Sequence, residues 1–201
     1  MDFVVRWTAA ILAGGQGRRL GGVDKSALPL GRDSILDRQL ELVRPLTPHI
    51  LIVAGADRRF ETSGVSVVVD RIAGAGALGG LYTALVEAPT EQVLVIACDM
   101  PFLTAPFLTR LAECGSHADA AVPRDERGRH PLCASYHRRI SAHIKSRIER
   151  GALRVLDALD GLDIREMGPD ELAAFNSDGR LLLNVNTPAE YEQARAFAAS
   201  R

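Results

Sequence analysis

The sequence TAAILAGGQGRRLGGVDK, residues 8–25, decides the fold class. Its first six residues, Thr8–Ala13, form a mostly apolar run, and five of the nine residues from 14 to 22 are glycine. A short apolar run that ends in glycines is typical of a buried strand followed by a loop. Because glycine has no side chain and readily adopts positive φ angles, the backbone amides of such a loop can approach a ligand closely.

The loop is also cationic. Arg18, Arg19 and Lys25 outnumber its single carboxylate, Asp24, on a chain whose formal net charge is −1. Backbone N–H groups combined with guanidinium and ammonium groups are well suited to a polyphosphate. The loop therefore predicts a site for nucleotide phosphates.

Two common phosphate-binding motifs do not fit this loop. A Walker loop requires Gly-Lys-Ser/Thr, whereas Gly22 is followed by Val23 and Asp24. A dinucleotide fingerprint that began at Gly15 would need glycine at position 20, where Leu20 stands. The loop is therefore of another type.

Further short apolar runs alternate with segments that resemble helices. We expect strands at Ile50–Ala54, Val65–Val69, Val93–Ala97 and Ala120–Pro123. Runs that are apolar at every position are typical of strands covered on both faces, as in a parallel sheet. The prediction is an α/β fold, with three α/β/α layers and a mostly parallel, Rossmann-like sheet. Short strands after Asp125 are expected to form a small antiparallel addition in the C-terminal half.

Helix boundaries are marked by capping signals. Ser34 precedes an apolar helical face, and Thr104 precedes another, so both are expected to be N-caps. The segment Leu81–Ala88 is expected to be helical after a second glycine-rich loop, Gly74–Gly80. Near the C-terminus, Thr187–Glu190 (TPAE) combines a cap, a proline at the first helical position and the glutamate of a capping box.

The composition excludes several classes of protein. The 201 residues predict one domain, residues 1–201. The 24 Lys+Arg balance 25 Asp+Glu and aromatic residues make up 5%, so neither a basic field nor a base-stacking surface indicates nucleic-acid binding. The apolar start is interrupted by Asp2 and Arg6 and is too short to span a membrane. Three well-separated cysteines without a CxxC pair predict reduced thiols and a cytoplasmic location.

Two aspartates follow expected strands. Asp99 comes after Val93–Ala97, and Asp70 comes directly after Val65–Val69. In open α/β sheets, ligands bind at the carboxyl ends of the strands. Mg²⁺ prefers one or two carboxylates together with phosphate oxygens and water, so Asp99 is predicted to hold Mg²⁺ on a nucleotide. The alternative for each aspartate is the capping of a turn, and for Asp70 the residues alone favour neither.

Two weaker signals remain open. His130, Cys133 and His137 lie close together, but the odd step from 130 to 133 places those two residues on opposite faces of a strand, which argues against a metal site. Three arginines on or near a polar helix belong either to a solvated face or to a surface for an acidic second substrate. They are Arg147, Arg150 and Arg154.

Residues 12–25 resemble the signature of the nucleotidyltransferases that share a sugar-nucleotide pyrophosphorylase-like fold. The ending Arg19–Lys25 is similar to the form found in the molybdenum cofactor guanylyltransferase family. Further blocks fit that family in order: Gly76–Gly80, Ala97–Pro101, His130–Leu132 and Asn184–Pro188. The match spans nearly the whole chain. Two positions depart from the family pattern, because Ala77 replaces an expected proline and no asparagine occurs in residues 53–57.

The resemblance implies transfer of GMP from GTP to the terminal phosphate of molybdopterin-bound molybdenum, with release of pyrophosphate. The N-terminal half would bind the nucleotide and the C-terminal half the acceptor. The implied nucleotide contacts are Leu12, Ala13, Gly14, Gly15, Lys25, Asp70, Gly79 and Asp99. The implied catalytic residues are Arg19, Lys25 and Asp99, with Arg19 on the leaving pyrophosphate and Mg²⁺ on Asp99. Asn184 and Asn186 would contact the acceptor.

Other readings stay open from the sequence. One is a CTP-dependent molybdopterin cytidylyltransferase, and a sugar-phosphate nucleotidyltransferase is a more distant enzyme. From a different class, the chain could be a nucleotide- or cofactor-binding partner without catalysis, although Lys25 and Asp99 would then be dispensable. We expect a transferase to interact with proteins that donate or accept the molybdenum cofactor. We expect no nucleic-acid or membrane partner.

Overall fold

A computed structural model describes residues 7–13, 27–55 and 64–199. Within these ranges, eight strands form one sheet in the order β10-β7-β9-β6-β1-β4-β5, and β8 pairs with β7. The strands are β1 (Trp7–Leu12), β4 (Ile50–Ala54), β5 (Ser66–Val69), β6 (Gln92–Ala97), β7 (Ala120–Asp125), β8 (Gly128–Arg129), β9 (Cys133–His137) and β10 (Ile164–Met167). A separate two-stranded hairpin consists of β2 (Pro29–Leu30) and β3 (Asp33–Ser34).

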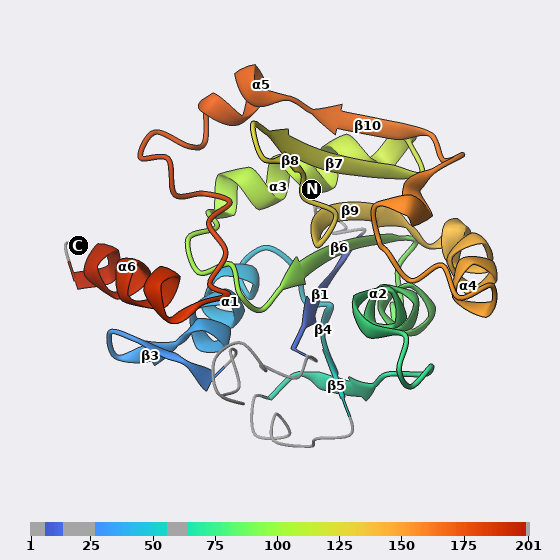
Figure 1. Ribbon diagram of the computed structural model, residues 1–201, viewed down its shortest axis with the longest axis horizontal. Helices are drawn as coiled ribbons and strands as arrows, with labels where there is room; N and C mark the ends of the chain where they lie inside the picture. Colours follow the sequence, from blue (N-terminus) through green and yellow to red (C-terminus); the bar gives the residue numbers. More distant parts are fainter. Residues whose placement is uncertain (1–6, 14–26, 56–63, 200–201) are drawn as a thin grey trace.

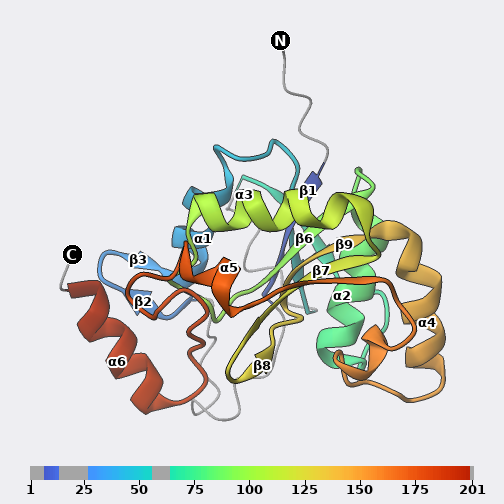
Figure 2. The same ribbon diagram turned by 90° about the horizontal axis from the view of Figure 1, so that it is seen from above.

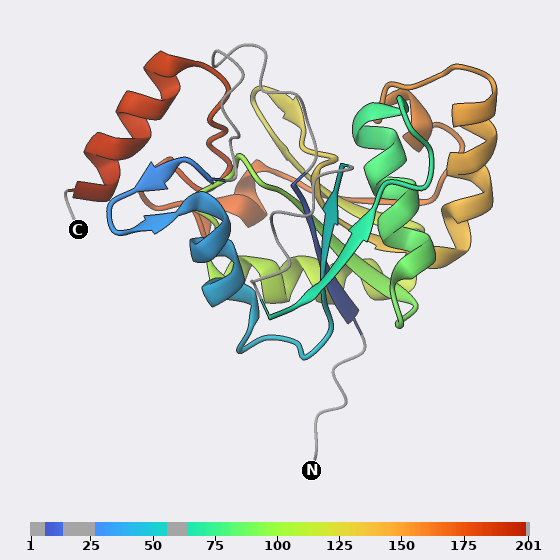
Figure 3. The same cartoon turned by 90° about the horizontal axis from the view of Figure 1, so that it is seen from below.

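Helices cover both faces of the sheet. They are α1 (Ile35–Val43), α2 (Gly76–Glu87), α3 (Ala105–Cys114), α4 (Ser141–Glu149), α5 (Pro169–Ala173) and α6 (Pro188–Ala199), with 3-10 turns η4 (Gly115–His117), η5 (Arg138–Ile140) and η6 (Asp157–Leu159). Helices α1 and α3 lie on one face, and α2 and α4 lie on the other (Figures 1, 2 and 3). Each face has its own buried apolar cluster. The predicted three-layer α/β/α architecture is confirmed.

The sheet is parallel at its centre and mixed at one side. Strand β1 pairs in parallel with β4 and with β6, and β4 pairs in parallel with β5. Their carboxyl ends therefore meet at a single edge of the sheet. Strand β9 runs antiparallel to β6 and β7, so the residues that precede β9 return to that same edge. The expected antiparallel addition is confirmed, and it brings residues 130–133 beside the end of β6.

The three predicted N-caps stand at the starts of helices, and two of them make the expected capping hydrogen bonds. Ser34 caps α1: its hydroxyl accepts from Asp37 N at 3.1 Å, and Asp37 accepts from Ser34 N in return. Thr187 and Glu190 form the predicted capping box of α6 through hydrogen bonds of 2.8 and 3.2 Å. Thr104 stands at the N-cap of α3, but its side chain makes no capping hydrogen bond.

The second glycine-rich segment is not the loop that the sequence predicts. Helix α2 begins at Gly76 and includes Gly79 and Gly80, because the leucines that follow on this segment are fully buried against the sheet. A Cβ at Gly79 would lie 2.9 Å from the Cβ of Ala75. Close packing at the start of the helix therefore explains Gly79, and tertiary burial overrides the low helix propensity of glycine.

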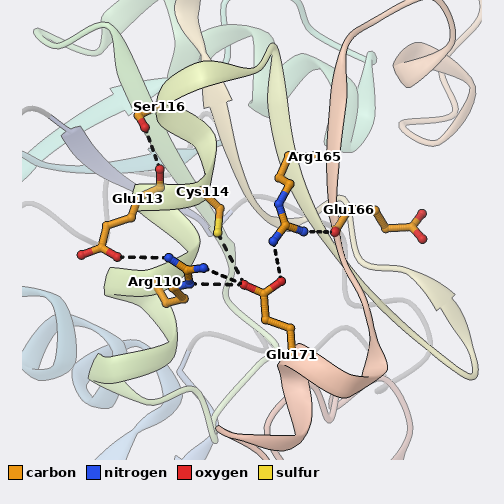
Figure 4. Close-up of polar contacts among 7 residues, drawn as sticks. All are labelled: Arg110, Glu113, Cys114, Ser116, Arg165, Glu166 and Glu171. Atoms are coloured by element: carbon orange, nitrogen blue, oxygen red, sulfur yellow. Dashed lines mark hydrogen bonds and ion pairs between the residues drawn. The ribbon is translucent and has the colours of Figure 1, made fainter.

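Side-chain hydrogen bonds and ion pairs attach the C-terminal segment to other elements. Residue Tyr191 of α6 donates its hydroxyl to Pro29 O at 2.6 Å, which fastens α6 to the β2–β3 hairpin (Figure 1). Glu171 of α5 accepts from Arg110 of α3 at 3.2 Å and from Arg165 of β10 at 2.6 Å (Figure 4). These exposed ion pairs add modest stability, but they tie three separate elements together.

Of the helices in the described ranges, none combines the length and apolar character needed to cross a membrane.

Gly115, the C-cap of α3, makes a prediction about stability. A Cβ there would overlap Nε2 of Gln92 and Oγ of Ser135, which are buried and joined by a hydrogen bond of 2.7 Å. We expect Gly115→Ala to lower the free energy of unfolding by about 1–3 kcal/mol, as overpacking does in other cores. Urea unfolding measures this. Gly55→Ala, where a Cβ meets nothing within 4 Å, is the control, and equal stability of Gly115→Ala and the unaltered chain would contradict the account.

Candidate active site

A cavity of about 380 Å³ opens at the carboxyl edge of the sheet. Its polar lining residues are Asp99, Arg129, His130, Arg154, Asn184 and Asn186. Pro131, Leu132, Val155 and Leu156 form an apolar part of the wall. Cavities of this size and mixed character suit a small molecule that is oriented by a few polar groups.

Asp99 reaches this cavity from the end of β6, on a turn that is held from two sides. Buried Gln39 of α1 donates its side-chain amide to Ala97 O at 2.8 Å and to Met100 O at 3.0 Å. On the other side, Val185 N donates to Asp99 O at 2.8 Å. The backbone at Asp99 is therefore fixed by elements far apart in the sequence.

The same contact explains why Asn184 and Asn186 belong to the cavity. Because Val185 N bonds to Asp99 O, the two flanking asparagines lie beside Asp99. Oδ1 of Asn184 is buried and accepts no hydrogen bond from the described part of the chain. A buried amide oxygen without a partner is costly, so it is suited to meet a ligand. The structure thus brings together three residues predicted from two separate motifs.

A second group of predicted residues gathers on the other side of β1. A Cβ at Gly80 would lie 3.6 Å from the side chain of Leu12 and 3.8 Å from Oδ1 of Asp70, so these residues adjoin. Burial raises the pKa of Asp70, and its Oδ1 has no hydrogen-bond partner among the described residues. The side chains of Leu12 and Ala13 are nearly buried, so any contact with a nucleotide would come from their backbone.

Four predicted site residues lie outside the described ranges. They are Gly14, Gly15, Arg19 and Lys25, all in the first glycine-rich segment. Gly79 is described, but it lies inside α2 rather than in a loop. The nucleotide contacts of these residues therefore stay predictions.

The oxygen donors at this edge fit a magnesium ion. Asp99 offers a carboxylate and Asn184 a buried amide oxygen, both on the same cavity. Hard cations such as Mg²⁺ prefer oxygen ligands, and on a nucleotide they need only one or two from the protein. Within the described ranges, no cluster of three or more His, Cys, Asp or Glu could hold a metal by itself. A phosphate-bound Mg²⁺ is thus the type of metal that the residues suit.

The sequence contains too little to indicate that His130 lines the cavity. Its Nε2 lies 2.9 Å from Oδ1 of Asp125, whereas Cys133 is fully buried within β9. The sequence signal was present in the His130–Leu132 block, but its partner Asp125 stands at the end of β7, across the β7–β8 turn. Gln39 was also missed, because its contacts are 58 and 61 residues away. Of the three arginines left open, Arg154 lines the cavity.

Two of the three cysteines, Cys114 and Cys133, are poorly suited to act as nucleophiles. Burial raises the pKa of Cys133, which is fully enclosed. Burial also raises the pKa of Cys114, despite the neighbouring Arg110 (Figure 4). A thiol with a raised pKa is a poor nucleophile at neutral pH. Carboxylate, amide and guanidinium groups therefore define the chemistry of the edge.

An α/β sheet with a carboxylate, amides and cations gathered at its carboxyl edge is typical of a protein that binds a nucleotide or another small ligand there. Residues 9–162 match the family described as the MobA-like NTP transferase domain. The chain belongs to this family.

Similar proteins extend this result. A probable molybdenum cofactor guanylyltransferase of Pelotomaculum thermopropionicum is 31% identical over 95% of this chain and 93% of its own length. A molybdenum cofactor guanylyltransferase of Desulfosudis oleivorans is 31% identical, with 94% of each chain covered. The structure of molybdopterin-guanine dinucleotide biosynthesis protein A from Archaeoglobus fulgidus superposes with a TM-score of 0.85 at 24% identity, over 96% of this chain and all of the other.

Proposed function

We propose that this protein transfers GMP from GTP to molybdopterin-bound molybdenum and releases pyrophosphate. Relatives named molybdenum cofactor guanylyltransferase cover nearly the entire chain. The observation that carries the proposal is the cavity in which Asp99 meets Asn184 and Asn186. It places a predicted nucleotide-side carboxylate next to two predicted acceptor-side amides.

The reaction needs positioning more than acid–base chemistry. The attacking phosphate oxygen of the acceptor is already anionic, so no strong general base is required. Rate enhancement would come from holding the attacking oxygen in line with the leaving pyrophosphate and from neutralising their charge. Arg19 and Lys25 would supply cations on the nucleotide, while Asn184 and Asn186 would orient the acceptor on the opposite side of Asp99.

Asp99 would hold Mg²⁺ when the nucleotide binds. Bound there, Mg²⁺ would supply positive charge that offsets the negative charge developing at the α-phosphate. Asp70, whose buried carboxylate stands on the other side of β1, would contact the nucleotide. Burial raises the pKa of this carboxyl, and its Oδ1 has no hydrogen-bond partner among the described residues, which is consistent with a group that a ligand contacts.

The nucleotide itself is tested by competition. Purified protein, Mg²⁺ and molybdopterin-bound molybdenum are incubated with GTP, CTP, ATP or UTP in parallel, and pyrophosphate and the pterin-attached nucleotide are measured. We expect attachment of GMP alone. Attachment of CMP would identify a cytidylyltransferase with the same mechanism. Binding of nucleotide without transfer would identify a binding partner and contradict the proposal.

The proposed reaction also implies partner proteins and a location in the cell. A labile product calls for proteins that donate and accept the cofactor, so contacts with such proteins are expected near the cavity. We propose that the protein acts in the cytoplasm, where the reducing conditions keep cysteines as thiols.

A further inference from the structure

His130 is held in the cavity wall by two backbone hydrogen bonds and by a close contact between its ring and a carboxylate. Its backbone N–H donates to Pro123 O at 2.8 Å, and its carbonyl accepts from Cys133 N at 3.0 Å. Its side chain is 12% exposed, and Nε2 lies 2.9 Å from Oδ1 of Asp125. Both the backbone and one ring nitrogen are therefore fixed, and the ring lines the same cavity as Asp99.

Asp125 is placed to determine the tautomer of this ring. Burial acts to raise the pKa of Asp125, but hydrogen bonds from Arg127 and His130 outweigh it and hold the pKa at about 2. Asp125 is therefore an anion near neutral pH and can only accept hydrogen bonds. A carboxylate beside Nε2 favours the tautomer of a neutral imidazole that carries its proton on Nε2, which leaves Nδ1 as an acceptor.

The contact with Asp125 is not needed to balance charge in the hairpin. Arg127 already binds Oδ2 of Asp125 through Nε at 3.0 Å and Nη2 at 2.7 Å, and its backbone N–H binds Oδ1 at 2.9 Å. Arg127 Nη2 also donates to Leu182 O at 3.0 Å, two residues before Asn184. Asp125 thus connects His130 with the segment that carries the acceptor-side asparagines.

We propose that His130 binds the acceptor, and that Asp125 is a positioning residue which orients the imidazole so that Nδ1 accepts a hydrogen bond from an N–H or O–H group of the pterin. This inference rests on the proposed function and adds a specificity contact to it. A pterin carries ring N–H and amino donors, and the apolar wall of Leu132 and Val155 beside His130 suits its flat ring. An imidazole acceptor would not contribute to binding the phosphate, which offers acceptors itself.

Two substitutions of His130 test the roles of Nδ1 and Nε2 separately. His130→Gln can place an amide near Nε2 and keep the bond to Asp125, but it leaves nothing at Nδ1. His130→Asn places a polar group near Nδ1 and loses the bond to Asp125. We expect His130→Gln to raise the KM for molybdopterin-bound molybdenum about tenfold, the loss of roughly one hydrogen bond, with the KM for GTP and the Tm unchanged. His130→Asn should keep a lower acceptor KM than His130→Gln although its Tm falls.

The positioning role of Asp125 is tested with Asp125→Asn. The amide can donate to Nε2 and so permits the other tautomer, which should raise the acceptor KM severalfold with kcat and the KM for GTP little changed. Exposed His117→Gln and Asp170→Asn are matched controls and should leave all constants unchanged. Equal acceptor KM for His130→Gln and the unaltered chain, or a lower acceptor KM for His130→Gln than for His130→Asn, would overturn the proposal.

A binding measurement separates this inference from the proposed function. The dissociation constant of molybdopterin is measured without nucleotide, through the intrinsic fluorescence of the pterin. We expect the same order of affinities: unaltered chain, His130→Asn, then His130→Gln. If the unaltered chain binds the pterin in this order but transfers no GMP, the proposed function fails and the His130 contact stands. If transfer proceeds and the affinities do not differ, the His130 contact fails alone.

Discussion

Asp99→Asn is expected to lower kcat for GMP transfer by about 100- to 1,000-fold, the usual cost of removing one electrostatic group from a transition state. The substitution keeps the shape of the side chain and removes its charge. The turn itself should survive, because Gln39 and Val185 hold it through backbone atoms at Ala97, Asp99 and Met100. Steady-state kinetics with varied Mg²⁺ measures the effect.

The Mg²⁺ dependence distinguishes a metal ligand from a structural carboxylate. With Asp99→Asn, the Mg²⁺ concentration for half-maximal rate should rise, and Tm should change little. Asp170→Asn, an exposed aspartate on α5, is the control and should behave as the unaltered chain. A turnover within threefold of the unaltered chain would refute the assignment of Asp99 to Mg²⁺.

Gln39→Leu is expected to affect both stability and activity. The change leaves the carbonyls of Ala97 and Met100 without their buried amide donor, and each such loss costs about 1–3 kcal/mol. We therefore expect the free energy of unfolding to fall by roughly 2–5 kcal/mol. A small shift of Asp99 follows, and kcat should fall at least tenfold even at temperatures where the variant is fully folded.

The control for this variant is Gln193→Leu, on the exposed side of α6. Urea unfolding and kinetics at a low temperature separate the two effects. Gln39→Asn has the same amide on a shorter side chain and should not restore the two bonds. Wild-type stability of Gln39→Leu would show that the amide does not support the turn.

The central strands could be predicted from the sequence because they are buried on both faces. Strand β4 matches its predicted bounds, β1 is shifted by one residue at both ends, and β6 begins one residue earlier than predicted. The start of α2 could not be predicted, since Gly76, Gly79 and Gly80 indicate a loop locally and only packing makes them helical. Strands of two to four residues, such as β8 and β10, leave too short a pattern to locate.

The residues of the candidate site also divide into those that could be predicted from the sequence and those that could not. Asp99 was predictable because it follows a buried strand, and Asn184 and Asn186 because they belong to a resemblance to known enzymes. Side-chain contacts were not predictable: Asp125 meets His130 because the chain turns back from β7 into β8. In the sequence, nothing distinguishes Gln39 from other helix residues. Its role becomes visible only in the structure, where α1 packs against the end of β6.

The central claim is that one edge of the sheet joins a GTP-derived nucleotide to a pterin acceptor. The most direct test is incubation of the protein with Mg²⁺, molybdopterin-bound molybdenum and GTP labelled at the α-phosphate. The account predicts that the label becomes attached to the pterin, with one pyrophosphate released for each label transferred. Label that stays in GTP, or that appears as free GMP without attachment to the pterin, would contradict it.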